Sequence, residues 1–185
     1  MRLFTAIDIP AEVQERLRAL LARLKPTAKI SWSPVHNLHI TTKFIGEWPE
    51  NRLEEMKRAL AAIPKPGSIE ISVRGLGWFP NERRPRVFWA GIEAAGMEAK
   101  ETLRTLAHST EQALAKLGVP VEERDYSPHL TLARIREAVK LDALHHAIQS
   151  LPKGTLDFGS FHAAEFFLYL SAGGKYTRLA EFHLR

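Results

Sequence analysis

The sequence predicts an α+β fold with two mainly antiparallel sheets flanked by helices, built as one domain of two similar lobes over residues 1–185. Three observations lead to this prediction. Strand and helix patterns are interspersed along the chain, several neighbouring strands look like hairpins, and one strand motif occurs twice, at His39 and again at His129. Because the two copies sit at comparable points of the two halves, we expect a pseudo-two-fold arrangement with a central cleft between the lobes.

The strands are predicted from alternation of apolar and polar residues, as in Ile69, Ile71 and Val73 with polar residues between them. The expected strands cover residues 3–9, 30–32, 33–45, 69–79, 87–92, 129–134, 163–170 and 176–184. The helices are predicted from apolar residues at helical spacing, with proline or glycine at their ends. The expected helices cover residues 10–24, 53–63, 97–117 and 141–151.

The composition is that of an ordinary globular protein, with 45% hydrophobic and 25% charged residues. The chain has no cysteine, which excludes disulfides, zinc–thiolate sites and cysteine nucleophiles. No apolar run reaches the roughly 20 residues of a membrane span, and the amino terminus lacks a signal-peptide pattern. We therefore expect a cytoplasmic protein without a membrane segment and with no obligate protein partner.

The charge favours anionic partners, because the formal net charge is +5 and the pI is about 9.6. One basic cluster, Arg83-Arg84-Pro85-Arg86, falls in the turn between two apolar strands. It suits contact with a phosphate backbone and suits an ordinary solvated loop equally well.

The repeated motif is His39-Ile40-Thr41-Thr42 and His129-Leu130-Thr131-Leu132. Side chains of a strand alternate between its faces, so each histidine points the same way as the threonine two residues later. The aliphatic residues point to the other face. A single His-x-Thr sequence is more often structural than functional, but its repetition in similar surroundings favours a functional pair.

These motifs and their flanking residues resemble the two-histidine phosphoesterases, and within them the RNA 2',3'-cyclic phosphodiesterases, the LigT-like proteins formerly described as 2'-5' RNA ligases. The resemblance implies a bilobal fold with the motif strands facing each other, and metal-independent hydrolysis of a 2',3'-cyclic phosphate to a 2'-phosphomonoester. It also implies weak reverse joining of RNA ends through a 2'-5' bond. The matching segments are Arg2–Ile7, Asn37–Gly46, Leu76–Pro80, Pro128–Arg134 and Tyr176–Leu184.

Two histidines suit displacement at phosphorus, which needs a base and an acid on opposite sides of one atom. An unperturbed imidazole pKa of about 6.5 lets one ring be neutral and the other protonated near neutral pH. We expect His129 to activate water and His39 to protonate the departing ribose oxygen, with the roles exchanged in the reverse reaction. Thr41 and Thr131 are expected to donate hydrogen bonds to non-bridging phosphate oxygens.

Three further residues are candidates for substrate binding. Arg134 would clamp the phosphate, but simple alternation places it on the face opposite His129, so this role requires a bulge or a strand end after Leu132. Phe44 has the same offset from His39 and is a candidate for stacking on a base, with a core position at least as compatible. Tyr126 is a further stacking candidate.

The other six histidines have neither a threonine partner nor the spacing of metal ligands, and no Asp or Glu lies within three residues of either motif in the sequence. We therefore expect neither a metal nor a cofactor. The expected partners are RNA ends or nucleotides that carry a 2',3'-cyclic phosphate. Two alternatives stay open: a non-catalytic RNA-binding module, and a phosphodiesterase for another small cyclic phosphate such as an ADP-ribose derivative.

Overall fold

A computed structural model describes all 185 residues and contains two antiparallel sheets. The first has the strand order β3-β1-β8-β9 and the second the order β2-β6-β5-β4-β7. The strands are β1 (Arg2–Asp8), β2 (Ser31–Trp32), β3 (His39–Glu47), β4 (Ile69–Phe79), β5 (Val87–Ala94), β6 (His129–Arg134), β7 (Asp157–Ala163), β8 (Glu165–Ala172) and β9 (Lys175–His183). This architecture confirms the predicted α+β class with antiparallel sheets.

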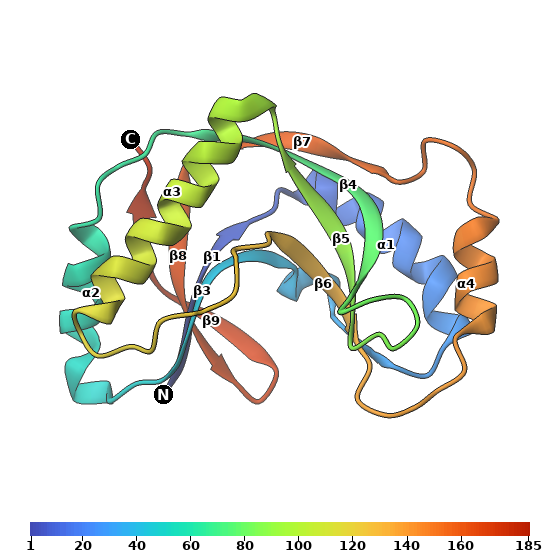
Figure 1. The fold of residues 1–185 in the computed structure, drawn as a ribbon, viewed down its shortest axis with the longest axis horizontal. Helices are drawn as coiled ribbons and strands as arrows, with labels where there is room; N and C mark the ends of the chain where they lie inside the picture. The colour runs from blue at the N-terminus through green and yellow to red at the C-terminus, as the bar shows by residue number, and fades with distance from the viewer.

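The helices lie around the two sheets (Figure 1). They are α1 (Ala11–Leu24), α2 (Leu53–Ala61), α3 (Gly96–Ala115) and α4 (Asp142–Gln149). Helix α2 lies beside the β3-β1-β8-β9 sheet, α3 contacts strands of both sheets, and α1 and α4 lie at the far end of the other sheet, so the motif strands β3 and β6 fall near the middle of the molecule. None of the helices is both long and apolar enough to cross a membrane.

The predicted apolar faces are the buried ones. Helix α1 buries the five residues that recur at helical spacing, Val13, Leu17, Leu20, Leu21 and Leu24. In β4, Ile69, Ile71 and Val73 are fully buried while the residues between them are not. Side chains from both sheets and all four helices join one continuous cluster of 36 buried residues, so the two halves share a single hydrophobic core.

The carboxyl-terminal strands differ from the prediction. Residues 157–163 form an additional strand, β7, at the edge of the β4 sheet, and the predicted strand 163–170 is instead β8, Glu165–Ala172. Gly159, at φ +105°, interrupts the alternation that identifies strands, and this explains why the sequence pattern missed β7. The chain passes from one sheet to the other at Ala164, whose carbonyl accepts a hydrogen bond from Leu184.

The approach to the first motif also differs. A 3₁₀ helix at Val35–Asn37 separates Ser33-Pro34 from β3, so the strand begins at His39 rather than directly after the proline. The strand also runs past its predicted end at residue 45 to Glu47, through Gly46 at φ +81°, a backbone conformation that glycine adopts readily.

A buried ion pair fixes β3 to α3. Lys43 of β3 is only 5% exposed, and its Nζ lies 2.5 Å from the Glu111 carboxylate of α3, which is 20% exposed. The ammonium group also donates to the Pro120 carbonyl at 2.8 Å. Glu111 accepts a further hydrogen bond from the backbone amide of Glu122. One carboxylate therefore anchors the strand that carries the first motif and the chain that leads towards the second.

Replacing Glu111 with Gln should lower the free energy of unfolding by about 3 kcal/mol, because the Lys43 charge stays buried without a counter-charge. Denaturant unfolding measures this change. The matched control is Glu101→Gln on the same helix, whose contact with Arg104 at 3.9 Å is exposed, so that its loss should cost no more than about 0.5 kcal/mol. Equal, small effects of both substitutions would show that the Lys43 pair does not stabilise the fold.

Candidate active site

A one-residue bulge follows the motif threonine of β3. Thr41 and Lys43 lie opposite consecutive residues of β1, so Thr42 is the extra residue of the pair. The Thr42 hydroxyl forms a buried hydrogen bond of 2.7 Å with that of Thr5. Beyond the bulge the alternation is reset, and Phe44 lies on the same face as Thr41. Phe44 is 60% exposed and is therefore not a core residue.

The second motif strand carries the same bulge at the equivalent place. Thr131 and Ala133 lie opposite consecutive residues of β5, which makes Leu132 the extra residue. Leu132 and Ala133 are both fully buried, whereas Arg134 is exposed. The bulge thus returns Arg134 to the face of His129 and Thr131, as a role beside the histidines requires.

His39 is held by hydrogen bonds at both ring nitrogens. Its Nδ1 lies 2.6 Å from the carbonyl oxygen of Asn37, and its Nε2 lies 2.9 Å from the Thr41 hydroxyl. A carbonyl oxygen can only accept, so in the neutral ring the proton is on Nδ1. The Nε2 atom then accepts from Thr41 and is the ring nitrogen available for proton transfer.

His129 has the same bond at Nδ1, but its Nε2 has no hydrogen bond like that of His39 to Thr41. The Nδ1 atom lies 2.8 Å from the carbonyl of Ser127, again two residues before the histidine, so Nε2 is again the ring nitrogen available for proton transfer. The ring meets Phe79 edge-on, with ring centroids 5.0 Å apart. Both motifs therefore present the same nitrogen atom.

Burial lowers the pKa of both histidines, because an imidazolium loses hydration inside the protein. The carbonyl bonds from Asn37 and Ser127 oppose this shift in the pKa values. The Arg134 guanidinium lowers the pKa of each histidine further, and His129 lowers that of His39. The two rings and Arg134 thus interact electrostatically as one group.

A carboxylate stands beside only one of the histidines. Asp8 of β1 lies opposite His39 of β3 in the sheet and raises its pKa, although not enough to offset burial. Tyr169 donates a hydrogen bond of 2.6 Å to one Asp8 oxygen, and Arg178 donates one of 2.5 Å to the other. His39 also stacks on Phe4 at 4.7 Å. The two motifs are therefore alike in geometry but unlike in charge.

Trp89 forms part of the surface beside the second motif. It lies opposite Thr131, and its ring covers Gly77 of β4 so closely that a Cβ there would fall 2.1 Å from the indole. Phe79 lies 5.2 Å from this ring and connects it to His129. Glycine at position 77 is thus required for the indole to lie flat against the sheet.

Tyr126 lies between the two motifs rather than free at the surface. Its hydroxyl donates a hydrogen bond of 3.1 Å to the backbone carbonyl of Thr41, so the segment that leads into β6 is tied to β3. Burial raises the pKa of the Tyr126 phenol and keeps it neutral. The residue therefore contacts the first motif while it precedes the second by only three positions.

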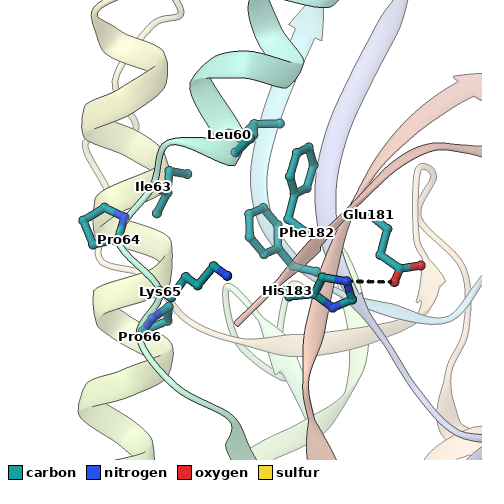
Figure 2. Close-up of a pocket in the computed structure, with 10 residues that line it drawn as sticks. Leu60, Ile63, Pro64, Lys65, Pro66, Glu181, Phe182 and His183 are labelled. Atoms are coloured by element: carbon teal, nitrogen blue, oxygen red, sulfur yellow. Dashed lines mark ion pairs between the residues drawn. The ribbon is translucent and has the colours of Figure 1, made fainter. Parts of the chain in front are cut away.

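A pocket of about 200 Å³ lies away from both motifs, between the end of α2 and β9. Figure 2 shows Leu60, Ile63 and Phe182 along it, with the His183–Glu181 contact at its edge. Glu181, His183 and Glu165 bring possible ligand atoms within 4.8 Å of one another. None of the motif residues lines this pocket.

The sequence reasoning missed Asp8, Tyr169 and Arg178. Their strands are far from the motifs along the chain, and only the pairing of β1 with β3 and β8 brings them beside His39. Trp89 lies within the predicted strand 87–92, but its position opposite Thr131 follows only from the pairing of β5 with β6. The structure brings His39, Thr41, Phe44, Tyr126, His129, Thr131 and Arg134, all of the predicted site residues, to the region where β3 and β6 meet.

Two facing His-x-Thr strands on paired antiparallel sheets define a two-histidine phosphoesterase. The family model described as LigT like Phosphoesterase matches residues 7–89 and 96–176, and the chain belongs to this family.

Similar proteins carry a more specific name. The RNA 2',3'-cyclic phosphodiesterase of Methanothermobacter thermautotrophicus is 32% identical over 190 residues, which span 100% of this chain and 99% of that protein. The protein of the same name from Thermus thermophilus is 37% identical over 142 residues, 72% of this chain and 68% of the relative.

Solved structures agree with the fold. The crystal structure of TT0787 from Thermus thermophilus has a TM-score of 0.77 at 29% identity and covers 100% of this chain and 98% of its own. LigT of E. coli in complex with 3'-AMP has a TM-score of 0.76 at 28% identity, covering 98% and 97%.

Replacing Tyr126 with Phe should destabilise the protein by about 1 kcal/mol, because the partly buried Thr41 carbonyl loses its side-chain donor while the ring stays in place. Thermal and denaturant unfolding measure this. Tyr126→Ala, which also removes the ring, should cost clearly more. If Tyr126→Phe were as stable as the unaltered protein, the hydrogen bond would not help to join the two motifs.

Proposed function

We propose that this protein hydrolyses the 2',3'-cyclic phosphate at RNA ends to a 2'-phosphomonoester, without a metal ion, by acid–base catalysis of its two motif histidines. The observation that carries the proposal is the matched pair of imidazoles. In each motif a backbone carbonyl two residues earlier binds Nδ1, which leaves Nε2 for proton transfer. Displacement at phosphorus needs two such groups on opposite sides of the reacting atom.

The charge difference between the motifs supports His129 as the base and His39 as the acid. Arg134 favours the neutral form of both rings, but Asp8 favours the protonated form of His39 alone, so His39 is the better acid and His129 the better base. In the proposed reaction, His129 takes a proton from water as the water oxygen bonds to phosphorus. The bond from phosphorus to the ribose 3' oxygen breaks, and His39 gives that oxygen its proton.

The other site residues suit the binding of a charged phosphate next to a nucleoside. Thr41 and Thr131 share the face of the histidines, and their hydroxyls are donors for the non-bridging oxygens. The Thr41 hydroxyl donates to Nε2 only while His39 is neutral, so its proton is free for the phosphate when His39 is protonated as the acid. Arg134 adds a charge-assisted contact. Phe44 is exposed at the position equivalent to Arg134 in the other strand, where its ring offers a surface for a base. The Tyr126 ring, held by its hydroxyl on Thr41, is the second aromatic candidate.

The relatives support both the reaction and the substrate. Proteins named RNA 2',3'-cyclic phosphodiesterase match this chain along most of its length. E. coli LigT, with a similar fold, has been solved with 3'-AMP, with ATP and with phosphate. A site that exchanges acid and base between two histidines also runs in reverse, so weak 2'-5' joining of RNA ends belongs to the same proposal.

Replacing His39 or His129 with Ala should lower kcat for a short RNA with a 2',3'-cyclic phosphate by about 10²- to 10⁴-fold, the usual contribution of general acid–base catalysis. The assay contains EDTA and identifies the 2'-phosphate product by mass and phosphate position. His108→Ala, at an exposed position on α3, is the control and should retain full activity. Binding without turnover in the unaltered protein would support an RNA-binding module instead.

Replacing Asp8 with Asn should move the alkaline limb of the kcat/KM profile to lower pH. That limb reports the loss of the acid's proton, and without the carboxylate the pKa of His39 falls, so the proton is lost earlier. The acid limb, which reports His129, should stay in place because Asp8 does not act on that ring. A shift of the acid limb alone would show that His39 is the base and His129 the acid.

A further inference from the structure

Five exposed arginines gather where the β4–β5 loop meets the end of β6, and none of them forms an ion pair with a carboxylate. We call this surface the arginine rim. Its members are Arg83, Arg84, Arg86, Arg134 and Arg136. In Figure 1 the loop lies beside the end of β6 and projects from the sheet. Two chain segments, residues 83–86 and 134–136, therefore contribute positive charge without a carboxylate partner to one edge of the sheet.

The loop of the arginine rim is docked against the chain that follows β6. The Arg86 amide donates to the Phe79 carbonyl at 2.6 Å, and the Ile135 amide donates to the Arg86 carbonyl at 2.9 Å. The Arg86 guanidinium reaches the carbonyl of Arg136 at 3.5 Å. A ligand that binds this surface meets an ordered loop, which reduces the entropy lost on binding.

The tip of the loop is shaped by one side chain. The Asn81 carbonyl oxygen accepts the backbone N–H groups of Arg83 and Arg84, both at 3.0 Å. This Asx turn satisfies the backbone locally and leaves both guanidiniums at the surface. The acidic residue of the loop, Glu82, lies 3.2 Å from His145 of α4 and so pairs with the helix.

The arginine rim begins at the proposed active site. Arg134 acts on the charge of both motif histidines, and Val87, the first residue after the loop, lies opposite Arg134. Phe79, the last strand residue before the loop, touches the His129 ring. A shallow depression of about 170 Å³ continues past Arg134, lined by Lys29 and Arg136 among others, with Glu137 as its one acidic residue. Positive charge thus extends outward from the reacting groups.

We infer that the arginine rim binds the phosphates of the RNA chain on the 5' side of the cyclic end, so that the preferred substrate is an oligonucleotide and not a mononucleotide. This inference rests on the proposed function. Guanidiniums without carboxylate partners bind backbone phosphates irrespective of sequence, and each phosphate neutralised releases counterions. The rim would therefore raise the affinity for RNA without a role in the chemical step.

The test compares two substrates that share the reacting group, 2',3'-cyclic AMP and a 12-nucleotide RNA with a 2',3'-cyclic phosphate. In the triple variant Arg83→Ala/Arg84→Ala/Arg86→Ala, kcat/KM for the RNA should fall at least tenfold at low salt. Its kcat/KM for 2',3'-cyclic AMP should stay within twofold of that of the unaltered protein, which also shows that the variant is folded. The slope of log kcat/KM for the RNA against log salt should become shallower by about 2, at roughly 0.7 per lost contact to a single strand.

Two further variants isolate the role of charge at this place. Arg83→Lys/Arg84→Lys/Arg86→Lys keeps the charge and should restore most of the RNA activity. Lys65→Ala/Lys100→Ala/Lys153→Ala removes the same charge from exposed positions elsewhere and should leave both substrates unaffected. The inference would be overturned if the alanine variant kept the kcat/KM of the unaltered protein for the RNA, or if its kcat/KM fell equally for both substrates.

Failure of the proposed function is distinguishable from failure of the arginine rim. If the unaltered protein turned over neither substrate, the proposed function would be wrong, and the rim is then judged by binding alone. Fluorescence anisotropy with a labelled RNA that ends in a 2'-phosphate provides this readout. A Kd at least tenfold weaker for the alanine variant supports the rim, and an unchanged Kd contradicts it.

Discussion

A carbonyl oxygen can only accept a hydrogen bond, and this constraint fixes the state of both motif histidines. Asn37 and Ser127 each place a backbone carbonyl against Nδ1 of the histidine two residues later, so the neutral rings carry their protons on the same atom. The backbone just before each strand therefore determines which ring nitrogen is left for the proton transfer of the proposed reaction. Three features of the structure hold the two motif strands together. They are the shared hydrophobic core, the hydrogen bond from Tyr126 to Thr41, and the Lys43–Glu111 ion pair.

The two motifs have the same backbone arrangement but different neighbouring side chains. Both strands have the same motif, the same carbonyl bond and the same bulge, yet the residue beyond the bulge is Phe44 in one and Arg134 in the other. Asp8 adds a second difference, since only His39 has a carboxylate beside it. A pair of equivalent imidazoles would share the two roles equally. Asp8 raises the pKa of His39 alone, and this difference between the rings is what the proposed acid and base roles rest on.

Much of the fold was predictable because local alternation and spacing carry the information. The four helices, the hairpin of β4 and β5, and the shared face of His39 with Thr41 follow from periods of 3.6 and 2 residues. The position of Arg134 was not predictable, because a bulge depends on pairing with β5. Asp8 was missed for a related reason: its place beside His39 results from contact between strands distant in sequence. Strand β7 escaped notice because Gly159 breaks the alternation on which the prediction depended.

The bulges also determine how this chain tolerates changes in length. Insertions and deletions are usually accepted in loops and rejected in strands, where they shift the pairing. Deletion of Leu132 would instead leave β6 regularly paired with β5, so the strand itself would survive. The residues after it would keep their faces, because Arg134 would then follow His129 by four residues and Ala133 would remain at its buried position opposite Phe88. A single lost codon could in this way shorten the strand and preserve both the sheet and the guanidinium at the site, because the bulge supplies the residue that is lost.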